Sequence, residues 1–144
     1  RSNTLKVLQL TGADIKAALE LCTAVFAVND CGEIDYSFNV NPHIIHPYAY
    51  DFWGGLDYEL SIDQPIGQRV TKLIFQGQPI TDDMTLNVAM NSYRATGAEF
   101  PMFQHKRVVF ESEDIIPEMI RKYIKQHSPI RCYKHGHFQV ICTK

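Results

Sequence analysis

Four groups with distinct chemistry lie close together in the stretch Asn91–Phe103: the aromatic ring of Tyr93, the guanidinium of Arg94, the flexible backbone of Gly97 and the carboxylate of Glu99. A tyrosine ring offers a flat π-face, and a carboxylate accepts hydrogen bonds from an amine or a hydroxyl. A glycine allows a positive φ and a close approach to the backbone. The stretch is therefore either a ligand site on a loop or an ordinary strand exit in which Tyr93 packs into the core.

Catalytic motifs do not accompany this stretch. The sequence contains no Gly-x-Ser-x-Gly elbow, no phosphate-binding glycine loop and no dinucleotide fingerprint. His43 and His46 have no carboxylate at ligand spacing, and His135 with His137 gives only a weak metal signal. We therefore expect no metal site and no catalysis within this chain, whereas ligand binding remains open.

The four cysteines do not define a site either. Cys22, Cys31, Cys132 and Cys142 contain no Cys-x-x-Cys pair and allow three disulfide pairings or none. Cys22 falls on the apolar side of a predicted helix and is predicted to be a buried free thiol. The redox compartment is left open by this pattern.

Length and charge restrict the class of protein. A chain of 144 residues predicts one domain with a real core, and a net charge of −2 without any basic run argues against a nucleic-acid polymer as partner. The longest apolar stretch, Ala17–Val28, contains Glu20 and is too short to span a membrane. The first residues, Arg1–Thr4, do not form a signal peptide, and we expect them to be a cut edge.

The first half of the chain predicts a strand followed by a helix. Leu5–Leu10 is an apolar strand, and Thr11 with Asp14 suits the start of a helix. Apolar residues then recur at helical spacing as far as Phe26, and turn residues at Asn29–Gly32 end the pattern. The irregular segment Glu33–Asp51 that follows is rich in aromatic rings, which either pack the segment onto the domain or line a site.

The second half predicts further strands and one helix. Three runs separated by Pro/Gly turns predict an antiparallel meander: Leu56–Ile62, Val70–Phe75 and Thr85–Met90. A strand at Lys106–Phe110, a helix from about Asp114 to Ser128 and a possible last strand at His137–Cys142 follow. The expected fold class is α+β, with mixed or antiparallel β-sheets and flanking helices.

These motifs together resemble the C-terminal domain of the 5′-nucleotidase family. The resemblance rests on Asn3–Glu20, on Gly54–Gly55 and the strand that follows it, on the hairpin from Gly67 to Ile80, on Asn91–Gly97 and on the closing segment Tyr123–Ile130. It implies a domain over residues 1–130, with residues 131–144 as a C-terminal tail that carries the possible extra strand. Tyr93 followed by Arg-Ala, together with the Tyr50–Phe52 segment, is most similar to the 2′,3′-cyclic-nucleotide 2′-phosphodiesterase/3′-nucleotidase branch.

The resemblance implies a division of labour between domains. In the family, an N-terminal metallophosphoesterase domain holds two divalent metals, and the C-terminal domain binds the nucleoside. It implies that Tyr93 stacks on the base, that Glu99 contacts the nucleoside and that Asn3 lies beside the base. The full set of expected substrate-binding residues is Tyr93, Glu99, Asn3, Gly97, Asn91 and Tyr50.

Two positions depart from the family pattern. Arg1 stands where the family has its second stacking aromatic residue, and Ala98 replaces the second glycine of the loop. Both departures concern the clamp that would hold a base from two sides.

The leading hypothesis is therefore a nucleotide-binding, specificity-setting domain of a metal-dependent nucleotide phosphohydrolase. The implied partners are a nucleotide or nucleoside and an upstream metallophosphoesterase domain of the same polypeptide, without which the isolated chain is expected to be inactive. The alternatives are a non-enzymatic surface or ligand-binding module that lost the base clamp, and a regulatory nucleotide sensor. The family also implies a secreted, periplasmic or cell-surface location.

Overall fold

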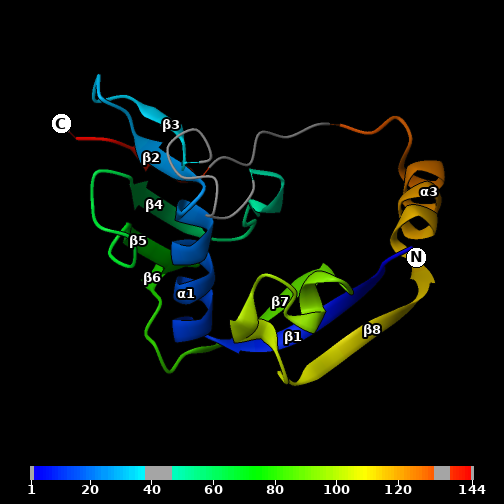
Figure 1. Cartoon of the computed structure of the whole chain (residues 1–144). Helices are drawn as coiled ribbons and strands as arrows, with labels where there is room; N and C mark the ends of the chain where they lie inside the picture. The colour runs from blue at the N-terminus through cyan, green and yellow to red at the C-terminus, as the bar shows by residue number, and fades with distance from the viewer. Residues whose placement is uncertain (1, 38–46, 132–136, 144) are drawn as a thin grey trace. The chain divides into compact units, whose positions relative to one another are not determined.

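The computed structural model describes residues 2–37, 47–131 and 137–143, and the chain divides into two compact units (Figure 1). Unit 1 consists of Arg1–Thr11 and Met84–Lys134, and unit 2 consists of Gly12–Asp83 and His135–Lys144. Both units contain a β-sheet and a helix, which confirms the predicted α+β class.

Unit 1 is built on a three-stranded antiparallel sheet with the strand order β7-β1-β8. Its elements are β1 (Thr4–Thr11), β7 (Thr85–Asn91), the short 3-10 helices η2 (Arg94–Thr96) and η3 (Pro101–Phe103), β8 (Val108–Ile115) and α3 (Ile116–His127). The pairing of β1 with β7 runs without interruption from Leu5 opposite Asn91 to Thr11 opposite Thr85. The start of β1 and the end of β7 therefore lie side by side at one end of the sheet.

Unit 2 contains a four-stranded sheet with the order β6-β5-β4-β9 and a separate β2–β3 hairpin. Its elements are α1 (Gly12–Thr23), β2 (Phe26–Val28), β3 (Ile34–Tyr36), η1 (Pro47–Ala49), β4 (Asp57–Ser61), β5 (Val70–Phe75), β6 (Gln78–Pro79) and β9 (Phe138–Ile141). Strand β9 pairs parallel with β4, and β4 pairs antiparallel with β5, so the sheet is mixed. The strand predicted in the C-terminal tail is β9, whereas the predicted domain boundary at residue 130 stays a prediction.

The predicted three-strand meander is wrong in its last step. Strand β5 continues into β6, while β7 leaves that sheet and pairs with β1 in unit 1. Seven successive residues of β1, Leu5–Thr11, each have a partner in β7, so β7 is paired along its whole length. Turn signals located the strands correctly but carried no information about their partners.

Helix α1 ends earlier than the apolar pattern predicts. It stops at Thr23, and Phe26 begins strand β2 instead of extending the helix. The Arg69 guanidinium donates to the carbonyl oxygen of Thr23 at 2.8 Å, a group that the helix end leaves free, and to that of Phe26 in β2 at 2.9 Å.

The same connection is fixed from the other side by Glu20, a buried residue near the end of α1. Its carboxylate accepts hydrogen bonds from the backbone N–H groups of Gly67 (3.0 Å), Arg69 (3.1 Å) and Val70 (2.8 Å). Burial lowers the pKa of Arg69 from its ordinary value, and the Glu20 charge opposes that shift. Because charged groups inside a protein need such partners, Glu20 and Arg69 together fix the turn between β4 and β5 against α1.

Candidate functional site

The loop after β7 begins with a turn that directs Tyr93 outward. The Asn91 side-chain oxygen accepts the backbone N–H of Arg94 at 2.8 Å. The carbonyl oxygen of Tyr93 accepts both the backbone N–H of Thr96 at 3.1 Å and its hydroxyl at 2.7 Å. These bonds fix the Tyr93 backbone while the residue remains 54% exposed, so the alternative that Tyr93 is a core residue is wrong.

Gly97 allows the loop to turn back on itself. Its φ is 82°, and a Cβ atom there would lie 2.3 Å from Cγ of Gln104 and 3.1 Å from the Gln104 backbone nitrogen. Its N–H donates to the Arg94 carbonyl oxygen at 3.0 Å, and its own carbonyl oxygen accepts the N–H of Phe100 at 3.1 Å. The position therefore requires glycine both for its backbone conformation and for space.

The Glu99 carboxylate is held by Arg94. One Arg94 nitrogen lies 3.5 Å from a carboxylate oxygen of Glu99 and also donates to the carbonyl oxygen of Ala98 at 3.2 Å. The Arg94 guanidinium is buried and lies 4.1 Å from the centre of the Phe100 ring. Glu99 itself adopts a positive φ of 63°, a conformation that is uncommon for residues other than glycine. A buried cation thus holds an accessible carboxylate in a fixed place on the loop.

Asn3 joins the same region through Ser92. The Ser92 hydroxyl donates to the Asn3 side-chain oxygen at 3.3 Å and accepts the backbone N–H of Thr4 at 3.1 Å. Because Ser92 precedes Tyr93, this contact brings the start of β1 to the start of the loop. We refer to Asn3, Asn91, Tyr93, Gly97 and Glu99 as the loop site, since five of the six predicted residues gather at this end of the unit 1 sheet.

Tyr50, the sixth predicted residue, belongs to unit 2 and has different surroundings. Its ring packs edge-on against Phe26 at 5.4 Å and Phe52 at 4.9 Å between ring centroids. Burial raises the pKa of the Tyr50 phenol above its ordinary value, and the neighbouring Tyr58, with which it is hydrogen-bonded, adds to that shift. Tyr50 therefore belongs to an aromatic cluster of unit 2, and its contact with a substrate stays a prediction.

Sequence reasoning did not place two residues that organise the loop site. Arg94 was recognised as a cation in the stretch but not as its internal support, and Phe100 was not singled out. Phe100 is fully buried and stacks on Phe103 with ring centroids 5.5 Å apart. The three-residue spacing of these phenylalanines around Pro101 was the available signal, because it suits two rings on one side of a helical turn.

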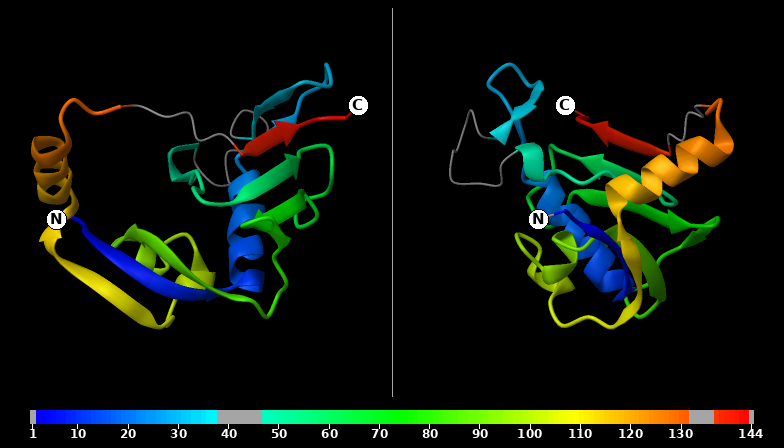
Figure 2. Two further views of the ribbon diagram at one scale, coloured as in Figure 1. Left: turned by 180° about the vertical axis from the view of Figure 1, so that it is seen from behind. Right: turned by 90° about the vertical axis from the view of Figure 1, so that its right-hand side faces the viewer.

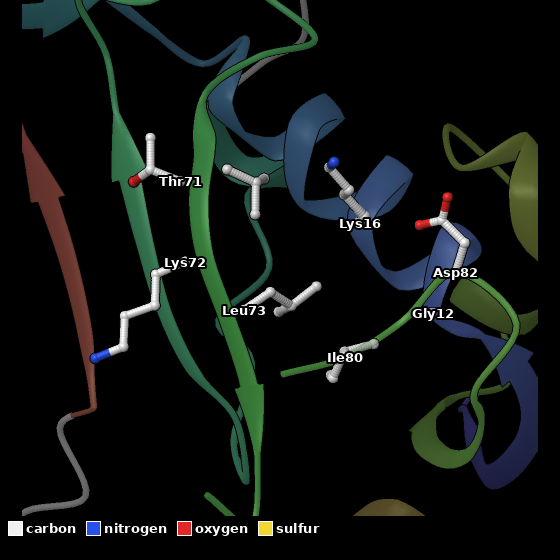
Figure 3. Close-up of a pocket in the computed structure, with 8 residues that line it drawn as sticks. Gly12, Lys16, Thr71, Lys72, Leu73, Ile80 and Asp82 are labelled. Atoms are coloured by element: carbon white, nitrogen blue, oxygen red, sulfur yellow. The ribbon is translucent and has the colours of Figure 1, made fainter. Parts of the chain in front are cut away.

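Unit 2 contains a small hollow between α1 and β5, which is shown in Figure 3. Its volume is about 190 Å³, below the roughly 300–1,000 Å³ of typical small-molecule sites. The Lys72 side chain extends away from α1 on the far side of β5, so the two lysines at this hollow do not converge. The loop-site residues do not line it, and we do not assign it a ligand.

Neither a metal centre nor a membrane-spanning helix is found in the part of the chain that the structure describes. Within residues 2–37, 47–131 and 137–143, no three His, Cys, Asp or Glu side chains gather in a way that could hold a metal ion. His135 lies outside the described residues, so the predicted pairing with His137 is not described. No described helix is long and apolar enough to cross a membrane.

A family model supports the interpretation of the sequence motifs. Residues 1–105 match the model described as "5'-nucleotidase, C-terminal domain". This match covers both the opening strand and helix and the whole loop site.

Two curated proteins with similar sequences carry the same name. The chain is 28% identical to a 2',3'-cyclic-nucleotide 2'-phosphodiesterase/3'-nucleotidase of Yersinia enterocolitica, over 93% of this chain and 22% of that protein. It is also 28% identical to a protein of the same name from Haemophilus influenzae, over 88% of this chain and 21% of that protein. The chain thus spans about a fifth of the length of the curated relatives it matches.

Solved structures share the fold. A putative 5'-nucleotidase from Staphylococcus aureus matches with a TM-score of 0.85 and 27% identity, over 96% of this chain and 27% of that one. The sulfate thiohydrolase SoxB of Thermus thermophilus matches with a TM-score of 0.63 and 21% identity, over 97% of this chain and 23% of that one. At this lower identity, the second match shows the fold alone.

Proposed function

The chain belongs to the 5′-nucleotidase C-terminal domain family, and we propose that it is the nucleoside-binding, specificity-setting domain of a metal-dependent nucleotide phosphohydrolase. The observation that carries this proposal is the exposed Tyr93 on the same loop as the Glu99 carboxylate, which Arg94 holds in place. The sequence similarity to 2',3'-cyclic-nucleotide 2'-phosphodiesterase/3'-nucleotidase proteins supports a nucleotide as the ligand class.

In the proposed mode of binding, Tyr93 provides one wall of the base site. Stacking on an aromatic side chain contributes roughly 1–3 kcal/mol per base and tolerates every base, because each has a π-face. Glu99 accepts a hydrogen bond from a ribose hydroxyl or from an exocyclic amine of the base. This combination favours broad acceptance of nucleotides, since the ring reads shape and a single carboxylate reads few base edges.

The proposal assigns hydrolysis to another part of the parent protein. The described residues of this chain do not fit a metal centre, and we derive no catalytic step from them. Two divalent metals would belong to an upstream metallophosphoesterase domain of the same polypeptide, where they would stabilise the attacking and leaving oxygens. As part of the same proposal, the parent protein is secreted, periplasmic or at the cell surface.

The central experiment replaces Tyr93 with alanine in the full-length protein. Loss of stacking should raise the KM for nucleotides by about tenfold, since 1.4 kcal/mol corresponds to a factor of ten. Tyr93→Phe keeps the π-face and should leave KM within about twofold of the original value. A suitable control is Tyr123→Ala, because Tyr123 is also in unit 1 and is 56% exposed.

An unchanged KM for Tyr93→Ala would reject the stacking role. The isolated chain gives a second test: adenosine should change its tyrosine or Trp53 fluorescence in a saturable way, and Tyr93→Ala should abolish that change. Binding without hydrolysis by the full-length protein would instead favour a nucleotide sensor.

The second candidate function is a non-enzymatic surface or ligand-binding module that kept the fold. Arg1 at the position of the second family aromatic and Ala98 at the second loop glycine favour it. The SoxB match supports only that the fold is not confined to proteins named as nucleotidases. The sequence upstream of this chain in the parent gene discriminates the candidates, because metal-binding Asp-x-His and Asn-His-Glu motifs there support the enzyme and their absence supports the module.

A further inference from the structure

Cys31 lies at the turn of the β2–β3 hairpin in unit 2. The Asn29 side-chain oxygen accepts the backbone N–H groups of Cys31 at 3.0 Å and Glu33 at 2.9 Å. The N–H of Gly32 donates to the Asn29 carbonyl oxygen at 2.9 Å. The Cys31 backbone is therefore fixed by its turn, while the residue itself is exposed and its thiol is free.

Cys142 lies directly after β9, and its neighbours on both sides are fixed. The carbonyl oxygen of Ile141 accepts the N–H of Ile62 at 2.8 Å. The hydroxyl of Thr143 donates to the Asp63 carboxylate. Cys142 is half-buried, and its thiol is also free.

The fold brings these two residues together, although they are far apart in sequence. The Cys142 sulfur lies 3.7 Å from the carbonyl oxygen of Gly32, the residue that follows Cys31. Both views in Figure 2 and that in Figure 1 show the end of β9 beside the β2–β3 hairpin. The contact therefore places Cys142 beside the residue that follows Cys31, and a disulfide needs the two Cα atoms about 4.4–6.8 Å apart.

Cys22 has a different environment and does not compete for either thiol. It is fully buried, and its sulfur faces the carbonyl oxygen of Asp51 at 3.9 Å. A thiol enclosed in the core is inaccessible to an oxidant. Among the three cysteines that the structure describes, the contacts therefore favour pairing Cys31 with Cys142.

We propose that Cys31 and Cys142 form a disulfide that ties strand β9 to the β2–β3 hairpin. With a small-molecule disulfide such as oxidised glutathione as oxidant, the exposed Cys31 thiolate attacks one glutathione sulfur and releases one glutathione thiolate. The Cys142 thiolate then attacks Cys31 in the mixed disulfide and displaces the second glutathione. The two protein thiols lose two electrons and two protons, and one oxidised glutathione becomes two reduced molecules.

The cross-link has a structural consequence for the edge of the sheet. Strand β9 is the edge strand next to β4 in the order β6-β5-β4-β9, and it reaches that place from the far end of the chain. A covalent bond between residues 31 and 142 restricts the unfolded chain strongly, because stabilisation by a disulfide grows with the length of the closed loop. The disulfide therefore keeps the last strand paired with unit 2 under oxidising conditions, which is where such bonds persist.

The pairing is tested by mapping peptides without reduction. The folded protein is incubated with oxidised glutathione, alkylated, and cut with trypsin and a protease that cleaves before Asp. This digestion places each cysteine on its own peptide, at residues 17–29, 30–34, 132–134 and 135–144. The expected product is a linked pair of 30–34 with 135–144, which a reductant separates.

Cysteine variants and thermal unfolding show which thiols form the bond and whether it stabilises the fold. The linked pair should persist in Cys132→Ser and Cys22→Ser and should vanish in Cys31→Ser. Thermal unfolding should show a midpoint about 10 °C lower after reduction in the original protein, and this difference should be lost in Cys31→Ser.

The pairing is overturned by any of three results. These are a linkage of Cys142 to a different cysteine in the folded protein, no linkage at all, or a linkage of 30–34 with 135–144 that forms only after unfolding in urea.

Discussion

Tyr93 and Tyr50 are two tyrosines with the same predicted role, and the structure gives them different surroundings. The Tyr93 ring is half exposed, while its backbone is fixed by hydrogen bonds from Thr96 and by the turn that Asn91 begins. The Tyr50 ring packs between Phe26 and Phe52. In the first case the backbone positions the ring, and in the second case neighbouring rings do.

This difference separates two kinds of aromatic residue that look alike in sequence. A ring whose backbone is fixed and whose face is open can bind a ligand without any change in packing. A ring that packs against other rings contributes to stability and has little face left for a ligand. Substitutions in the two regions should therefore have different effects, on stability in unit 2 and on binding in unit 1.

The largest expected effect is on stability, from Tyr50→Ala. Removal of this ring from the aromatic cluster should lower the free energy of unfolding by about 2–4 kcal/mol. Tyr93→Ala should change it by less than about 0.5 kcal/mol, because Tyr93 is about half exposed and no ring among the described residues stacks on it. Urea unfolding followed by Trp53 fluorescence and by circular dichroism measures both. Equal losses in the two variants would remove the distinction.

Gly97→Ala should have the next largest effect and should act through the loop site. A left-handed backbone costs an alanine roughly 1–2 kcal/mol, and the close approach of Gln104 adds to that loss. Gly77→Ala is the matched control, because Gly77 has a φ of 79° and no atom within 4 Å of an added Cβ. Gly97→Ala should be less stable than Gly77→Ala by about 1 kcal/mol. Adenosine binding should be lost in Gly97→Ala and kept in Gly77→Ala.

Arg94→Lys should destabilise the protein by about 1 kcal/mol. Lysine keeps the charge but loses the flat guanidinium that lies over Phe100 and the hydrogen bond to the Ala98 carbonyl oxygen. Arg121→Lys is the control, since Arg121 pairs with Glu118 on the exposed surface of α3. We expect that control to change stability by less than about 0.5 kcal/mol. Equal effects at both arginines would mean that Arg94 does not support the loop.

The smallest expected effect is a change in alkaline stability from Tyr50→Phe. Burial raises the pKa of Tyr50 in the folded state above its ordinary value. The folded protein therefore holds this proton more tightly than the unfolded chain, and the resulting stability is present below about pH 10 and is lost as the pH rises further. Tyr50→Phe should show a shallower fall of the thermal midpoint between about pH 9 and pH 11. Because the pKa of Tyr58 is also raised, part of the fall in the thermal midpoint should remain in Tyr50→Phe.

The extent to which sequence predicted the fold depended on local signals. The alternation in Leu56–Ile62 and the run Val70–Phe75 predicted β4 and β5 closely, since side-chain period and turn residues are properties of neighbouring positions. Phe26 was wrongly assigned to the helix, because its apolar spacing fits a helix as well as it fits a strand. The Thr23 carbonyl oxygen at the helix end is bound by Arg69, which is far away in sequence.

The candidate site was predictable to a similar extent. The order of residues from Asn91 to Glu99 marked the loop correctly, and the Asn3 position was added by resemblance to the family. The support of Glu99 by Arg94 and Phe100 was not predictable, because it depends on a positive φ at Glu99 and on a fold that places a cation over a ring.

The sequence by itself determined the family, the α+β class and the loop that carries Tyr93, because these follow from motif order and from local periodicity. Only the tertiary structure decided which ring is exposed, which strands pair and which turn Cys142 contacts. Each of those outcomes depends on contacts between distant positions, such as Cys142 with Gly32 or β7 with β1. A local pattern cannot contain such contacts, since they arise when each segment buries its apolar face and satisfies its backbone hydrogen bonds against the rest of the chain.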